Sequence, residues 1–140
     1  LEGMTKFFGS NILVTGGVLK EVEIQNFFKV RQVCRIPNPE RNDHEKNEFI
    51  DIFEILDPFL DKEKIFSLPL YNQALEKLYR NNFCRAQELF IRIEKNLYEY
   101  YSNHRDKIEK VDKACKYRIK QCIEFEEIGI SEWDGIDSDI

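Results

Sequence analysis

Hydrophobic and polar positions follow one period in the first part of the chain and another in the second, and the change comes at Pro58. Residues 28–36 alternate between two faces, which is the period-2 pattern of a half-buried strand, and residues 49–56 form a second strand segment. Between them, residues 37–47 are polar, contain two prolines and lack periodicity, which predicts a solvated loop. We therefore expect a β-hairpin with a long tip.

Short elements precede this hairpin. A first helix is expected to end at Gly9, because glycine readily takes the left-handed conformation that follows many helices. Residues 11–14 predict a strand, and Thr15 is placed to cap a short helix from Gly16 to Glu21. The first part of the chain is therefore expected to mix helices with strands.

After the boundary, apolar residues recur at spacings of three and four, which is typical of helices. Ser67 can cap a first helix, Asn81 and Asn82 form a short turn, and a third helix is expected from about residue 104 to residue 127, before Gly129. The apolar stripes consist of Leu70, Ala74, Leu75, Leu78 and Tyr79 in the first helix, of Phe83, Ala86, Leu89, Phe90, Ile93 and Leu97 in the second, and of Ile108, Val111, Ala114, Cys115, Ile119, Cys122 and Phe125 in the third.

These patterns predict an α+β fold in two parts. Residues 1–57 would form a partial sheet with a β-hairpin, and residues 58–140 a helical hairpin followed by a third helix. With 140 residues, the chain has room for two small subdomains but not for two full domains. Near the end, Trp133 is expected to pack back on the helices, and the acidic residues after the Asp134–Gly135 turn signal are expected to fray.

Composition narrows the range of partners. Lys and Arg total 21 against 26 Asp and Glu, a net charge of -5 that argues against nucleic acid and anionic membrane as main partners. No apolar run approaches the roughly 20 residues that cross a bilayer. The four cysteines contain no CxxC pair, so we expect reduced thiols and a cytoplasmic location. Cys115 and Cys122 lie two helical turns apart and should share one buried face.

The residues alone provide no complete active site. His44 and His104 have no neighbouring Ser or Cys nucleophile, and no close His completes a metal site around the cysteines. The pair Gly16–Gly17 lacks the phosphate-binding patterns of glycine-rich turns. Cations on or near the predicted hairpin could meet a phosphate, but exposed cations are also ordinary on strand edges; they are Arg31, Arg35, Arg41 and Lys46.

Several segments of the first part resemble a known family. Leu1 to Gly9, Ile12 to Thr15 with Val18–Leu19, residues 28–33 and residues 49–56 resemble, in this order, the last third of a class III adenylate/guanylate cyclase catalytic domain. The last segment contains the aromatic-Glu-aliphatic trio Phe53-Glu54-Ile55. The resemblance implies that residues 1–57 form part of a ferredoxin-like cyclase sheet.

The second part resembles the tail of such enzymes. Ala74, Phe83, Ala86 and Phe90 match the small and aromatic positions of a tetratricopeptide helix pair. Tyr117-Arg118, Cys122, Phe125, Gly129 and Trp133-Asp134-Gly135 resemble the segment that follows the cyclase domain in many bacterial receptor-type cyclases. A helical tail of this kind is expected to pack on the catalytic part or to bind protein.

The resemblance implies a parent enzyme of signal transduction. It would be a homodimeric lyase that converts ATP, or less often GTP, to the 3′,5′-cyclic nucleotide and pyrophosphate with Mg or Mn. It would lie in the cytoplasm, with an upstream segment as a candidate anchor in the inner membrane. The metal-binding aspartates, the base-selecting pair and the transition-state Asn and Arg of the family would all precede Leu1, so these residues include no catalytic one.

One departure from the family bears on substrate binding. The family's triphosphate-binding Lys lies in a Val-Lys-Gly-Lys turn between the closing strands, where this chain has Ile36-Pro37-Asn38-Pro39 and a longer loop. Arg41 and Lys46 are then the candidates for contact with the nucleoside triphosphate. The alternative is a degenerate cyclase homologue whose helical tail is a non-catalytic protein-interaction module.

Overall fold

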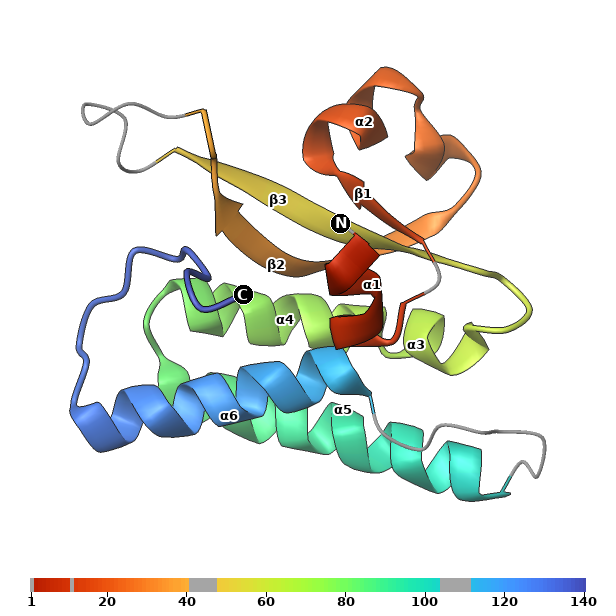
Figure 1. Ribbon diagram of the computed structural model, residues 1–140. Helices are drawn as coiled ribbons and strands as arrows, with labels where there is room; N and C mark the ends of the chain where they lie inside the picture. Colours follow the sequence, from red (N-terminus) through yellow and green to blue (C-terminus); the bar gives the residue numbers. More distant parts are fainter. Residues whose placement is uncertain (1, 11, 41–47, 104–111) are drawn as a thin grey trace. The chain divides into compact units, whose positions relative to one another are not determined.

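The computed structural model describes residues 2–10, 12–40, 48–103 and 112–140, and Figure 1 shows the order of their helices and strands. The chain forms two compact units, one of Leu1–Leu60 with Asp134–Ile140 and one of Asp61–Trp133. We call them the sheet unit and the helical unit. An antiparallel sheet and several helices confirm the predicted α+β class. The last seven residues group with the sheet unit, although the sequence suggested that they belong with the helices.

The sheet unit contains a three-stranded antiparallel sheet in the order β1-β3-β2. Its central strand, β3, pairs with both others, so β2 and β3 form the expected hairpin. The elements of the unit are α1 (Glu2–Phe8), β1 (Leu13–Thr15), α2 (Gly16–Glu21), the short 3₁₀ helix η1 (Ile24–Asn26), β2 (Lys29–Pro37) and β3 (Phe49–Leu56). The bounds of α2 and β3 agree with the prediction.

A β-bulge interrupts β2 and overturns the strict alternation predicted for residues 28–36. Pairing runs from Lys29 opposite Leu56 to Gln32 opposite Phe53, and then continues with Cys34 opposite Ile52, so the register skips Val33. A bulge inserts one extra residue into a strand and changes which side its neighbours face. Consequently, the four consecutive residues from Arg31 to Cys34 are all buried.

The predicted helix ends in the sheet unit are confirmed. Gly9 follows α1 with a φ of 64°, in the left-handed region that glycine tolerates best. The Thr15 side chain accepts a hydrogen bond of 3.2 Å from the backbone N–H of Val18 and so caps α2.

The helical unit contains α3 (Lys62–Phe66), α4 (Leu68–Tyr79), α5 (Phe83–Asn103) and α6 (Lys113–Ile128). Ser67 occupies the N-cap position of α4, as predicted, but its side chain makes no capping bond, and its hydroxyl instead donates to the carbonyl of Lys64 at 3.0 Å. The separate helix α3, which the sequence did not indicate, explains this difference: Ser67 lies between two helices and bonds back to the first.

The third long helix begins later than about residue 104, the start that the sequence suggested. Asp112 caps α6, and its carboxylate accepts a bond of 3.4 Å from the backbone N–H of Cys115. The end of the helix agrees with the prediction, since Gly129 follows it with a φ of 80°. Residues 104–111 lie outside the described part of the chain.

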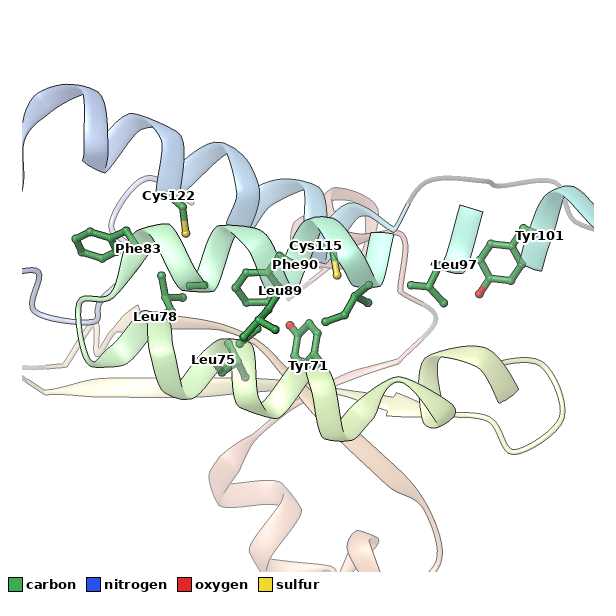
Figure 2. Packing of buried hydrophobic residues seen from close by; sticks show 13 residues of the cluster. Tyr71, Leu75, Leu78, Phe83, Leu89, Phe90, Leu97, Tyr101, Cys115 and Cys122 are labelled. Atoms are coloured by element: carbon green, nitrogen blue, oxygen red, sulfur yellow. The ribbon is translucent and has the colours of Figure 1, made fainter. Parts of the chain in front are cut away.

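The core of the helical unit lies between α4, α5 and α6 (Figure 2). Cys115 and Cys122 are both completely buried in it, which confirms that they share an inward face of α6. Trp133 packs against this core, as expected, and stacks on Tyr79 with a centroid distance of 5.8 Å. The labelled core residues are Tyr71, Leu75 and Leu78 from α4, Phe83, Leu89, Phe90, Leu97 and Tyr101 from α5, and the two cysteines from α6.

Candidate functional site

The hairpin of the sheet unit is the candidate site that the sequence indicated. Arg41 and Lys46, the two candidates for triphosphate contact, lie outside the described residues. The structure does describe both ends of the tip that carries them. There, the backbone N–H of Asn38 donates to the carbonyl of Glu48 at 3.2 Å, and the Asn38 side-chain amide donates to the Glu48 carboxylate at 3.2 Å.

The tip is more acidic than a phosphate site would favour. Between Asn38 and Glu48 the sequence has the two cations Arg41 and Lys46 but four acids, Glu40, Asp43, Glu45 and Glu48. Nearby acids repel a polyphosphate and offset the attraction of the cations.

Arg35 is engaged within the hairpin by an acid of the neighbouring strand. Its Nε lies 2.7 Å from a carboxylate oxygen of Asp51, and its guanidinium lies 4.1 Å from the ring centroid of Phe49. The side-chain amide of Gln32 donates to the same Asp51 oxygen at 2.7 Å. A phosphate at this place would compete with the carboxylate for the guanidinium, so Arg35 is a poor anion site.

Arg31 belongs to a buried polar cluster that the sequence did not predict. Its Nε lies 3.3 Å from a carboxylate oxygen of Glu54, and the two side chains are only 1% and 2% exposed. The hydroxyl of Ser10 donates to the other oxygen of Glu54. The sequence contained one signal for this cluster: Glu54 is a charged residue within an apolar strand, and a buried charge needs a partner. The cluster joins the segment after α1 to β2 and β3, and its burial keeps solutes away.

The tail residues that carry the family resemblance meet around the end of α4. Arg118 is fully buried, and it donates to the Gln121 side chain at 2.9 Å and to the Tyr79 hydroxyl at 3.2 Å. Its guanidinium also lies 5.3 Å from the ring centroid of Tyr117. Because Trp133 stacks on the same Tyr79, Arg118 and Trp133 both contact one side chain. In this unit these motif residues have a structural role.

Burial shifts the pKa of two titratable groups in the helical unit. Burial raises the pKa of the Cys122 thiol to about 12, which keeps it protonated and unreactive. Burial and the nearby Asp112 carboxylate raise the pKa of Glu94 on α5, while Lys116 opposes the shift. Cys84 is the exposed thiol among the four cysteines, and it lies at the start of α5.

The described residues also bear on the expected metal ions. They bring together no group of three or more His, Cys, Asp or Glu side chains that could hold a metal. Within the same described part of the chain, no helix is long and apolar enough to span a bilayer.

Comparisons with known proteins leave the function to be inferred from the residues themselves. No protein-family model matches the chain, and neither a curated protein nor a solved structure does.

Proposed function

We propose that this chain is the C-terminal part of a class III nucleotidyl cyclase, an enzyme that forms a 3′,5′-cyclic nucleotide and pyrophosphate from ATP or GTP. The observation that carries the proposal is the buried cluster of Ser10, Arg31 and Glu54. Arg31 and Glu54 lie in two separate segments that resemble the cyclase domain, and Ser10 directly follows a third. Segments that are matched separately in sequence are thus joined by one polar cluster, as expected if they belong to one domain.

Under this proposal the sheet unit completes a larger catalytic sheet and supplies no catalytic residue itself. The surface of the unit supports this role, because several large apolar side chains are exposed on it. Ile12, next to β1, is 53% exposed, and Phe27, before β2, is 78% exposed. The residues that bind metal and perform the cyclisation are assigned to another part of the protein.

The direct test is activity of the protein encoded with its upstream sequence. Cyclic nucleotide formation from ATP and from GTP would be measured with Mg and with Mn. The proposal predicts turnover with at least one nucleotide. Absence of product under all four conditions, from a folded protein, would refute the catalytic assignment.

The same assay tests Arg41 and Lys46. If they contact the triphosphate, Arg41→Ala with Lys46→Ala should raise KM for the nucleotide by roughly tenfold or more, because each charge-assisted bond to a phosphate contributes substantially to binding. The matched control is Arg92→Ala with Lys95→Ala, which removes an exposed Arg and an exposed Lys from α5 in the helical unit. An equal KM in the two double variants would remove the hairpin tip from the substrate site.

The helical unit favours a second candidate function, a non-catalytic protein-interaction module. It has its own core, and α4 and α5 form a helical hairpin in which Ala74 and Ala86 are completely buried, as in a tetratricopeptide pair. The outer side of α5 exposes Ile91 and Tyr98, which lie two helical turns apart and are 44% and 51% exposed. If this candidate is correct, the longer protein makes no cyclic nucleotide, and Ile91→Glu abolishes its binding to a partner while unfolding of the unit is unchanged.

A further inference from the structure

Strand β2 lies at an edge of the sheet, since the strand order is β1-β3-β2. In an antiparallel pair, alternate residues of an edge strand turn their N–H and C=O groups away from the partner. Such groups are a template for pairing with another chain. β2 has nine residues, which is long for an edge strand that is left uncovered.

The chain's own end occupies this edge at Arg35. The backbone N–H of Asp137 donates to the carbonyl of Arg35 at 2.6 Å, and the backbone N–H of Arg35 donates to the Asp137 carboxylate at 2.8 Å. Both outward backbone groups of Arg35 are therefore satisfied by one residue. One of the two bonds has a charged acceptor, which makes it stronger than a bond between neutral groups.

The segment that reaches β2 is ordered by local contacts of its own. The Asp134 carboxylate accepts a hydrogen bond of 2.9 Å from the backbone N–H of Ile136, and Gly135 between them has a φ of 84°. Ile136 and Asp137 are then only 4% and 1% exposed. The expectation that the end after this turn frays is therefore wrong for Ile136 and Asp137, which are buried in the sheet unit.

We propose that the outer edge of β2 at Arg35 is a strand-docking site, and that the chain's own residues 134–140 occupy it and block pairing with a second copy. Recognition uses backbone N–H and C=O groups, as in strand addition to a sheet edge, together with one carboxylate. The occupant is identified by its bonds to Arg35 and by its grouping with the sheet unit. This inference holds whether or not the protein is a cyclase.

Hydrogen exchange of the Arg35 amide in the full chain tests the contact. Asp137→Ala should make this amide exchange roughly tenfold faster or more, the factor expected for loss of a hydrogen bond to a charged group. The control Glu132→Ala removes an exposed acid that lies just before the docking segment and should leave exchange at Arg35 unchanged. Equal exchange at Arg35 in wild type and Asp137→Ala would overturn the proposal.

Self-association tests the blocking role. A chain without residues 134–140 should form dimers or larger species whose fraction rises with concentration in analytical ultracentrifugation. A synthetic peptide of residues 134–140 should return it to monomer, and the same peptide with Ala in place of Asp137 should not.

A monomeric truncated chain that keeps native Trp133 fluorescence would refute blocking. A wild-type dimer that loses protection at Arg35 on dilution would refute occupation by the same chain. If the truncated chain does not fold, self-association of the full-length Asp137→Ala chain decides, and an Asp137→Ala chain that stays monomeric at every concentration would refute blocking.

Discussion

At the scale of single residues, the Arg31–Glu54 pair holds two charges away from water. Removing charges from water is costly, and the mutual attraction of the pair together with the Ser10 hydroxyl offsets the cost. Such a pair contributes little net stability relative to a well-packed apolar pair, but it penalises any arrangement that separates its members. It therefore fixes how β2, β3 and the segment after α1 meet.

The first prediction concerns this pair. Glu54→Ala leaves the Arg31 guanidinium buried without this carboxylate and should destabilise the sheet unit by about 3–5 kcal/mol. The milder Ser10→Ala should cost about 1–3 kcal/mol, since a buried acceptor loses one donor. Hydrogen exchange of the β3 amides measures the stability of both variants. Trp133 fluorescence would not report on the sheet unit, because the single Trp lies in the helical unit. Glu21→Ala, which removes an exposed acid from α2, is the control, and a cost for Glu54→Ala no larger than that control would contradict the prediction.

The second prediction is a pH dependence that arises from Glu94. Its pKa is raised above the ordinary 4.5, so the folded helical unit binds a proton more tightly than the unfolded chain does. Stability from this group is fully present below pH 4.5 and is lost as pH rises through the higher folded value. Glu94→Gln should therefore unfold at higher urea concentration than wild type at pH 7, and the difference should shrink toward pH 4.

Urea unfolding followed by Trp133 fluorescence measures this effect within the helical unit. Glu99→Gln removes an exposed carboxylate from the same helix and controls for the change in net charge. A Glu94→Gln variant that is less stable than wild type at pH 7 would show that the carboxylate, despite its burial, is held by favourable contacts.

At the scale of elements, the turn between α4 and α5 binds the segment that follows α6, through a contact between Asn81 and Trp133. Asn81 has a φ of 63°, and its side-chain oxygen accepts a bond of 3.2 Å from the backbone N–H of Trp133. Asparagine tolerates the left-handed conformation better than most residues, and here its side chain also binds the tail. One residue therefore has two structural roles.

The third prediction separates these two roles. Asn81→Gly keeps the backbone conformation but loses the bond to Trp133, so it should cost about 0.5–1.5 kcal/mol. Asn81→Ala also strains the backbone and should cost about 1–2 kcal/mol more than the glycine variant. Urea unfolding monitored by Trp133 fluorescence compares the free energy of unfolding of the two variants. An alanine variant as stable as the glycine variant would show that the left-handed conformation is not enforced.

Much of the element structure could be predicted from the sequence because its signals are local. The caps at Thr15 and Gly129 depend on the preferences of one residue, and the strand Phe49–Leu56 on a short pattern. The bulge at Val33 could not be predicted, because it depends on the register against another strand. The contact between Asp137 and Arg35 joins residues far apart in the sequence, so no local pattern indicates it.

The candidate site was less predictable than the fold for a related reason. Four cations near the hairpin look alike in sequence, but tertiary contacts divide them. Arg31 and Arg35 are each engaged by a carboxylate from β3, and only the register of the hairpin decides which acid each one meets. For Arg41 and Lys46 the role in triphosphate binding stays a prediction, since they lie outside the described residues.

At the scale of the whole molecule, the helical unit is inserted in the sheet unit along the chain. The chain enters the helical unit after Leu60 and returns to the sheet unit at Asp134. The period change at Pro58 indicated where the chain enters the helical unit, but no sequence signal indicated where it returns to the sheet unit. The chain therefore connects the two units at both ends of the helical unit, and the contact of Asp137 with Arg35 lies within the sheet unit.

The last prediction is that the two units differ in stability. The helical unit buries a continuous cluster of large side chains, whereas the sheet unit exposes apolar residues such as Phe27 and Val22, at 78% and 57%. Amides of β2 and β3 should therefore exchange faster than core amides of α5. Uniformly slow exchange across both units would contradict an incomplete sheet and weaken the cyclase proposal. Slower exchange of β1 and β3 in the longer protein, with α5 unchanged, would instead mean that upstream residues complete the sheet.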